Sequence, residues 1–241
     1  KAIEEALKER PELGHEMISV VFFQDNGLKR SQQMFSDLNK NAIKPTKSLS
    51  ILYDHRDKFS KFIVELTNIV EIFQGRVELE KTTFSNRSIK VFTLNGLSDA
   101  SMHLLGMSKG KKLTKEEEVF LKEFWDEVSK NIADWQNLLE RKITPAELRK
   151  EFVHSNTNSL NALGIVGRIL AKEYPENWKE KLRGLKNINW SRTNPEWEGR
   201  LLLNGRMLKN ALGIELAANT ILKKCGVTLS EDRLTYEKNH E

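Results

Sequence analysis

The sequence predicts an α+β protein that is predominantly helical. Apolar residues recur every three or four positions along most of the chain, and only one segment has the character of a buried strand. That strand covers residues 17–23, where β-branched and aromatic residues follow one another up to a turn at 25–27. Residues 76–80 and 89–92 are weaker strand candidates. Because a lone strand leaves its backbone groups unpaired, we expect most of its sheet to precede Lys1.

Helix signals account for the remaining elements. Asp57 is an apt N-cap for a helix over 59–73. Thr114 and Glu117 form a capping box that opens a long helix, whose apolar face extends to Leu139. Thr144, Pro145 and Glu147 open another helix with the same kind of capping box. Further helices are predicted over 28–39, 48–53, 160–173, 178–185, 195–203 and 206–224, with a stop at Gly226 and a loop over 106–112.

The composition is that of an ordinary globular protein. The 241 residues are 39% hydrophobic and 30% charged, which excludes disordered and collagen-like classes and suffices for one large domain or two small ones. The chain begins inside an amphipathic helix without an initiator methionine, so we expect a fragment. It has one cysteine, no signal peptide and no apolar run of about 18 residues, so we expect a cytoplasmic protein without membrane association.

Positive charge is concentrated in two segments. Residues 81–115 hold seven basic residues against one acidic residue, and residues 178–209 hold eight against three. Between them, residues 116–151 carry ten acidic and six basic residues. Such a field favours a polyanion such as DNA, although a solvated helical surface is an equal alternative on charge alone.

Catalytic and metal-binding patterns are weak. The densest polar cluster is Asp54-His55-Arg56-Asp57, which could offer a base and a phosphate clamp. The structural alternative is that Asp57 caps the following helix and Arg56 pairs with a carboxylate. Cys225 is read either as a thiol activated by neighbouring lysines or as a small buried residue. The histidines lie at no metal-ligand spacing, and no Walker-type loop is present. We predict no metal, no cofactor and no assigned catalytic residue.

Four segments together resemble the DndB family of DNA phosphorothioation (sulfur-modification) proteins. They are ISVVFF, SQQMFSDLNKNAIKPTKSLSILYDHRD, VELEKTTFSNRSIKVFTL and INWSRTNPEWEGRLLLNGRMLKN, the last followed by an apolar helix and GVTLSED. The similarity spans nearly the whole chain and is most specific over 32–57 and 190–206. The DGQHR motif of the family would lie before Lys1.

This resemblance implies a domain organisation and a function. Residues 1–57 would be the C-terminal part of a ParB-like mixed α/β domain, and 58–241 a helical domain. The implied function is that of a cytoplasmic bacterial repressor, which binds promoter DNA and limits transcription of the modification genes. Because prokaryotic regulators commonly read two half-sites, we also expect a homodimer.

Contact with the DNA backbone requires exposed Arg and Lys side chains, with neighbouring polar groups that fix the register. The basic segments supply both. Trp190 and Trp197 are interpreted as core anchors rather than base-stacking platforms, and the arginines around them could instead form a network with Glu196 and Glu198. The candidate DNA-binding residues are Lys44, Lys47, Lys81, Arg87, Lys90, Arg192, Arg200, Arg206 and Lys209.

Several alternatives stay open. Lys44 and Lys47 flank Pro45 ahead of a helix, a geometry that suits a phosphate or merely a capped turn. A helix-turn-helix pair over 194–224 would place Asn204-Gly205 in its turn. An interaction module would instead dock other modification proteins on an acidic helix over 114–140. The alternative to a regulator is a ParB-like enzyme that hydrolyses nucleotides or processes DNA, whose site the missing motif would complete with Arg30, Asn39, Asp54, His55 and Arg56.

Overall fold

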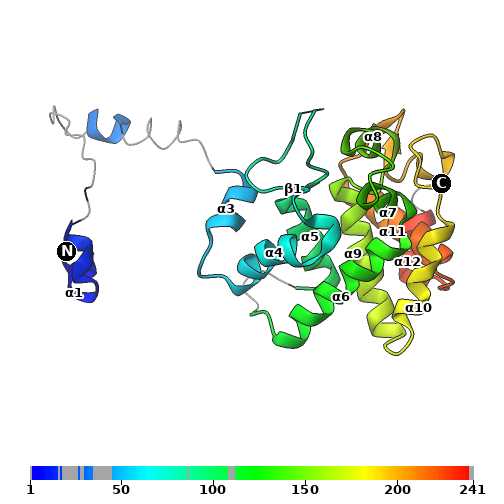
Figure 1. Cartoon of the computed structure of the whole chain (residues 1–241), viewed down its shortest axis with the longest axis horizontal. Helices are drawn as coiled ribbons and strands as arrows, with labels where there is room; N and C mark the ends of the chain where they lie inside the picture. Colours follow the sequence, from blue (N-terminus) through cyan, green and yellow to red (C-terminus); the bar gives the residue numbers. More distant parts are fainter. Residues whose placement is uncertain are drawn as a thin grey trace. The chain divides into compact units, whose positions relative to one another are not determined.

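The computed structural model describes residues 2–15, 17, 27, 30–34, 45–85, 87–107 and 112–238. The chain divides into two compact units, Lys1–Lys44 and Pro45–Glu241. The described part is predominantly helical with two short sheets, which confirms the predicted class (Figure 1). None of the described helices is long and apolar enough to cross a membrane. This division does not show which residues belong to a ParB-like domain, so the predicted domain boundary after residue 57 stays a prediction.

The first unit contains helix α1 (Ala2–Glu9), which a 3-10 turn, η1 (Pro11–His15), follows. Residues 30–34 are helical, within the helix predicted over 28–39. The predicted strand over 17–23 lies outside the described residues except for Met17.

The second unit opens with helices α3 (Lys47–Tyr53) and α4 (Lys58–Ile69). The carboxylate of Asp57 accepts hydrogen bonds from the backbone N–H groups of Phe59 and Ser60, at 3.3 and 3.0 Å, which confirms the predicted cap. Helix α4 is shorter than predicted. Its C-cap, Val70, is extended, and a 3-10 turn, η2 (Glu71–Phe73), follows.

Two weak strand candidates of the sequence pair with each other. Strand β1 (Val77–Glu78) lies parallel to strand β2 (Phe92–Thr93), with Val77 opposite Phe92. Helix α5 (Leu94–Leu105) follows β2 directly and was not predicted. The strands therefore frame an irregular loop that carries three of the seven basic residues of the first basic segment.

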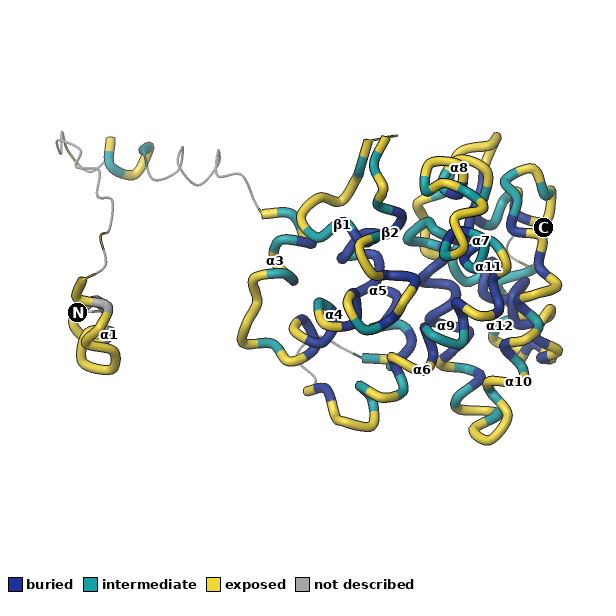
Figure 2. Tube along the Cα trace, viewed as in Figure 1, coloured by how far each residue is buried: buried dark blue, intermediate teal, exposed yellow. Residues whose placement is uncertain are grey.

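The centre of the unit is a pair of closely packed helices. Helix α9 (Thr157–Glu173) lies against α5, and α11 (Ala211–Lys224) also packs on α9. Figure 2 shows these helices among the most buried parts of the chain. An added Cβ on Gly164 would lie only 2.2 Å from the carbonyl oxygen of Ala100, so glycine is needed where α9 crosses α5.

The remaining helices of the unit include two that open with capping boxes. Both predicted capping boxes are present, at the starts of α6 (Lys115–Asn131) and α8 (Pro145–Glu151). The predicted long helix breaks at Ile132, which is extended, and continues as α7 (Ala133–Leu139). Helix α10 (Trp178–Leu182), the 3-10 turn η3 (Arg183–Asn187) and helix α12 (Glu231–Lys238) complete the unit.

The helices predicted over 195–203 and from 206 onward are wrong in their extents. A 3-10 turn, η4 (Pro195–Trp197), precedes an antiparallel hairpin of β3 (Leu202–Leu203) and β4 (Arg206–Met207), and α11 begins only at Ala211. The helix-turn-helix interpretation is therefore also wrong. The physical reason for the hairpin is the Asn204-Gly205 pair. Its backbone φ values are +50° and +72°, as in a type I′ hairpin turn.

Candidate nucleic-acid interface

Helix α8 organises the loop of the first basic segment through Arg149. Its guanidinium donates hydrogen bonds to the backbone carbonyls of Ser85, at 3.4 Å, Ser88, at 2.8 Å, and Lys90. It also lies 4.9 Å from the ring centroid of Phe84. Burial lowers the pKa of Arg149. The loop between β1 and β2 is thus held at several points by one side chain from elsewhere in the sequence.

The C-terminal end of α8 holds the middle of the second basic segment. Arg192 donates its backbone N–H to the carbonyl of Glu151 at 2.8 Å, and Phe152 forms an antiparallel bridge with Ser191. The N–H of Val153 bonds the carbonyl of Trp190 at 3.0 Å. Two segments that are about 100 residues apart in the sequence therefore meet on the same short helix (Figure 1).

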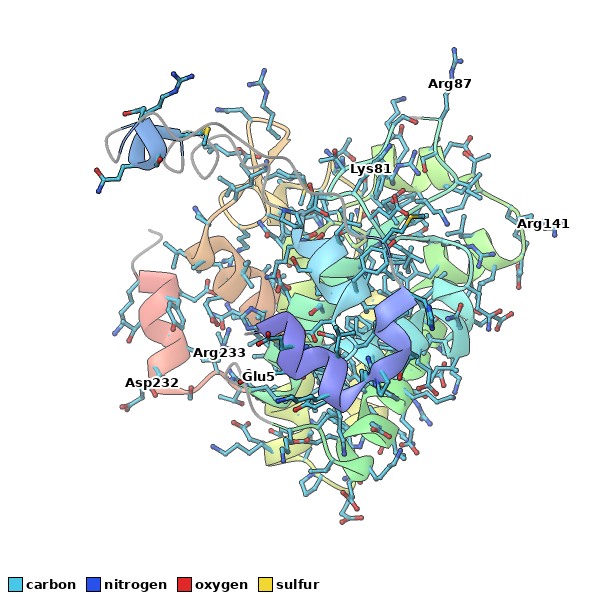
Figure 3. All side chains as sticks on the ribbon, turned by 90° about the vertical axis from the view of Figure 1, so that its left-hand side faces the viewer. Glu5, Lys81, Arg87, Arg141, Asp232 and Arg233 are labelled. Carbon is cyan, nitrogen blue, oxygen red and sulfur yellow. The ribbon has the colours of Figure 1, made fainter. Side chains whose placement is uncertain are left out.

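The exposed cations of the loop are Lys81 and Arg87. Figure 3 shows Arg87 extending away from the fold. The ammonium of Lys90 instead donates to the carbonyl of Gly75 at 3.0 Å and stabilises the base of the loop. Among the three candidates here, Lys81 and Arg87 are thus the ones that are exposed to solvent.

The candidate cations of the second segment also divide into exposed side chains and side chains that are buried or paired. Arg206 and Lys209 are exposed at the hairpin, beside a hollow of about 590 Å³. Arg192 is partly buried, which lowers its pKa. The guanidinium of Arg200 pairs with the carboxylate of Glu237 at 2.7 Å and donates to the carbonyl of Leu216 at 3.0 Å.

Of the two remaining candidates, the structure describes one. The ammonium of Lys47 pairs with the carboxylate of Asp99 on α5. Lys44 lies outside the described residues.

Trp190 and Trp197 are core anchors, as predicted. They are 3% and 0% exposed and stack on each other with ring centroids 5.3 Å apart. The indole N–H of Trp197 donates to the carbonyl of Asn189 at 2.9 Å. Glu196 and Glu198, the predicted partners of the nearby arginines, have other partners in the structure. Glu196 pairs with Lys224 at 3.0 Å, and the carboxylate of Glu198 accepts the N–H of Asn204 at 2.6 Å.

The structure describes only part of the alternative nucleotide site in one unit. One carboxylate oxygen of Asp54 accepts the backbone N–H groups of Arg56 and Asp57, both at 3.1 Å. His55 and Arg56 are exposed beside a hollow of about 710 Å³ that Tyr53 and Leu49 also line. Of the other two residues in this set, Arg30 belongs to the first unit and Asn39 lies outside the described residues.

The thiol of Cys225 is not activated. The residue is 4% exposed at the end of α11, and burial raises its pKa to about 12. The neighbouring lysines of the sequence therefore do not make it a thiolate at neutral pH. Within the described part of the chain, no three His, Cys, Asp or Glu side chains gather where they could hold a metal ion.

Comparison with known families gives one match. The family described as DndB, DNA-sulfur modification-associated, matches residues 1–228. No curated protein and no solved structure matches the chain. The matched range includes both basic segments and the whole of α8, and it ends before α12. Because the match covers nearly the entire sequence, the chain belongs to the DndB family of proteins associated with DNA sulfur modification.

Proposed function

We propose that this protein is a DNA-binding transcriptional regulator that represses the gene cluster for DNA phosphorothioate modification. The observation that carries this proposal is that parts of both basic segments meet at the C-terminal turn of α8. Arg149 in that turn fixes the loop that bears Lys81 and Arg87, and Glu151 and Val153 beside it bond residues 190–192 of the second segment. Exposed cations on a loop whose backbone is held by hydrogen bonds suit a phosphate backbone, because little backbone entropy is lost when they bind.

The partner in this proposal is double-stranded DNA from the promoter of the modification genes. The protein would then act in the bacterial cytoplasm, where the chromosome lies. Dimerisation would let two copies read two half-sites, and other proteins of the modification cluster are further candidate partners.

Fluorescence anisotropy tests the proposal. The full chain would be titrated with labelled promoter duplex and with a scrambled duplex of equal length, over a series of salt concentrations. We expect tighter binding to the promoter and a steep loss of affinity with salt, because each neutralised phosphate releases counterions. Equal, weak binding to both duplexes at physiological salt would contradict the proposal.

A second candidate function rests on the hollow beside Asp54, His55 and Arg56. A ParB-like nucleotide hydrolase or DNA-processing enzyme would use these groups as a base and a phosphate clamp. Thermal unfolding of the full chain with and without nucleoside triphosphates separates the two functions. A ligand that binds the folded state raises the melting temperature, so the absence of any shift at saturating concentrations would argue against this enzyme.

A further inference from the structure

The β3–β4 hairpin presents an apolar and a cationic side chain together at an exposed tip. Leu203 and Arg206 are cross-strand partners on either side of the Asn204-Gly205 turn. Leu203 is 52% exposed, whereas its neighbour Leu202 is 1% exposed, because successive strand residues point to opposite faces. The hairpin thus anchors itself in the core with one leucine and directs the next one outward.

The tip is held rigidly at its base. The N–H of Leu208 bonds the carbonyl of Leu201 at 2.8 Å, and the N–H of Gly199 bonds that of Leu202 at 2.7 Å. The carboxylate of Glu198 accepts the N–H of Asn204 at 2.6 Å. The outward position of Leu203 is therefore built into a fixed turn, so a ligand would meet it with little cost in entropy.

A single exposed leucine is ordinary on a protein surface, but the surroundings of this one are specific. It lines a hollow of about 590 Å³ together with Arg206 and Lys209. The sequence contains no acidic residue between Glu198 and Glu215. In the fold, the carboxylate of Glu198 is used by the N–H of Asn204 at the turn, and Arg206 and Lys209 are exposed beside the leucine. An apolar side chain beside two exposed cations matches a partner that is anionic outside and apolar within, as stacked base pairs are.

We propose that this tip enters the minor groove of DNA, where Leu203 wedges between two base pairs and Arg206 and Asn204 lie along the groove. Proteins that bend DNA through the minor groove insert apolar side chains in this way and flank them with Arg, Lys or Asn. The duplex would kink toward its major groove, which would bring more backbone to the loop that Arg149 holds. This inference rests on the proposed DNA-binding function.

The experiment uses 2-aminopurine beside a central TA step, because pyrimidine–purine steps unstack easily. Titration of the full chain should raise the 2-aminopurine fluorescence, and a donor and an acceptor on the duplex ends should report a shorter distance. In the Leu203→Ala variant we expect both signals to be lost, while affinity from anisotropy falls by no more than about tenfold, since the phosphate contacts remain. Leu234→Ala, at another exposed leucine (42%, on α12), should keep both signals.

The outcomes separate the wedge from DNA binding itself. If the wild-type chain shows no anisotropy change with any duplex, the proposed function fails and the wedge with it. If the wild-type chain binds but Leu203→Ala retains the full fluorescence rise, the wedge alone is wrong. A change of sedimentation coefficient in Leu203→Ala, without loss of the fluorescence rise, would assign the tip to contact between copies of the chain and overturn the proposal.

Discussion

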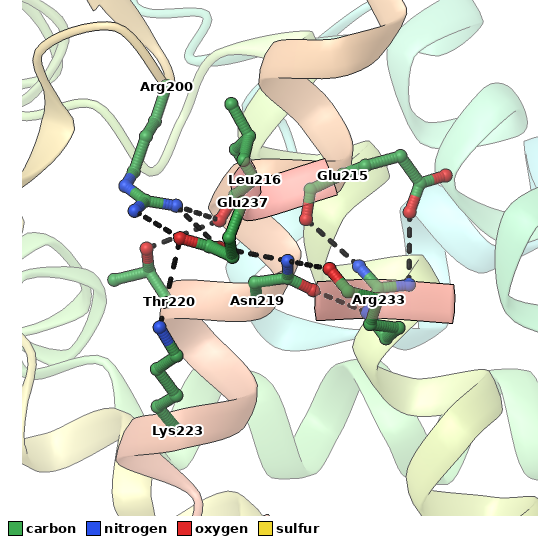
Figure 4. A network of polar contacts seen from close by, with 8 residues as sticks. All are labelled: Arg200, Glu215, Leu216, Asn219, Thr220, Lys223, Arg233 and Glu237. Atoms are coloured by element: carbon green, nitrogen blue, oxygen red, sulfur yellow. Dashed lines mark hydrogen bonds and ion pairs between the residues drawn. The ribbon is translucent and has the colours of Figure 1, made fainter. Parts of the chain in front are cut away.

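Glu237 and Arg200 form a bidentate pair across 37 residues of sequence, with both terminal guanidinium nitrogens donating to the carboxylate at 2.9 and 2.7 Å. Figure 4 shows the polar network around them. The amide of Asn219, which is fully buried, donates to Glu237 at 2.9 Å and to the carbonyl of Arg233 at 3.0 Å. Since α12 contributes no buried residue, these polar contacts account for its attachment to the fold.

The first prediction concerns this attachment. Glu237→Gln should reduce the protection of α12 against hydrogen exchange by about 1 to 3 kcal/mol, because charge-assisted bonds to Arg200 and Asn219 are weakened. These bonds hold the pKa of Glu237 at about 2, below its ordinary 4.5, so the stabilisation is present above about pH 4.5 and is lost as the pH falls toward 2. Glu231→Gln, at an exposed position on the same helix, is the control. Equal exchange in all three proteins would refute the prediction.

The second prediction concerns a buried histidine. The indole N–H of Trp135 donates to Nδ1 of His154 at 3.0 Å, so the proton of the neutral ring lies on Nε2, 3.2 Å from the carboxylate of Asp134. Burial lowers the pKa of His154. The unfolded chain therefore binds a proton that the folded chain does not, and stability should decrease as the pH falls from about 7 to about 5, by up to about 1.4 kcal/mol per pH unit.

Urea unfolding across this pH range tests the assignment. His154→Gln keeps an acceptor for Trp135 and removes the titration, so its stability should depend less on pH than that of the wild type. His55→Gln, which replaces an exposed histidine, is the matched control. An unchanged slope in His154→Gln would show that other groups cause the acid sensitivity.

The third prediction tests the contact between α5 and α9. Gly164→Ala should lower the free energy of unfolding by about 3 kcal/mol, because its Cβ would collide with the backbone of Ala100. Gly205→Ala is the matched comparison: open space surrounds its Cβ, but its φ is +72°, so only the left-handed backbone is penalised, by about 1 to 2 kcal/mol. A larger loss in Gly205→Ala than in Gly164→Ala would contradict close helix packing.

Local signals made much of the fold predictable. The caps at Asp57, Thr114 and Thr144 depend on side chains three residues or fewer from the groups they bind, and the structure confirms all three. Helix α5 was missed because small residues, such as Gly96 and Ala100, fill much of its buried face and give no strong hydrophobic period. The run of leucines before Asn204-Gly205 fits either period, and only the turn decides for a hairpin.

The site was less predictable than the fold. Arg149 bonds carbonyls about 60 residues earlier, and Glu237 bonds an arginine 37 residues earlier, so neither partner is visible from spacing along the chain. Sequence identified the basic segments but could not separate exposed cations such as Arg87 from those occupied by carboxylates such as Arg200. That difference arises from tertiary contacts.

The fourth prediction assigns Arg149 a positioning role. Arg149→Lys keeps a positive charge but loses the planar fork that reaches several carbonyls at once. We expect it to increase hydrogen exchange over residues 81–90 and to weaken DNA binding by a similar factor as Arg149→Met. Lys150→Ala, at the next and exposed position on α8, should change neither measurement. Wild-type affinity in Arg149→Lys would show that charge, rather than loop geometry, matters at this position.

The fifth prediction separates the candidate cations by their partners. Replacing both Lys81 and Arg87 by alanine should make the fall of log affinity with log salt less steep by about 2, because two phosphate contacts are lost. Thermal stability should change little. Arg200→Met should do the reverse, since its guanidinium already pairs with Glu237: melting temperature falls and the salt slope stays. Lys172→Ala, exposed on α9, should alter neither quantity. If Arg200→Met lowers the salt slope as the double variant does, its pair with Glu237 must open when DNA binds.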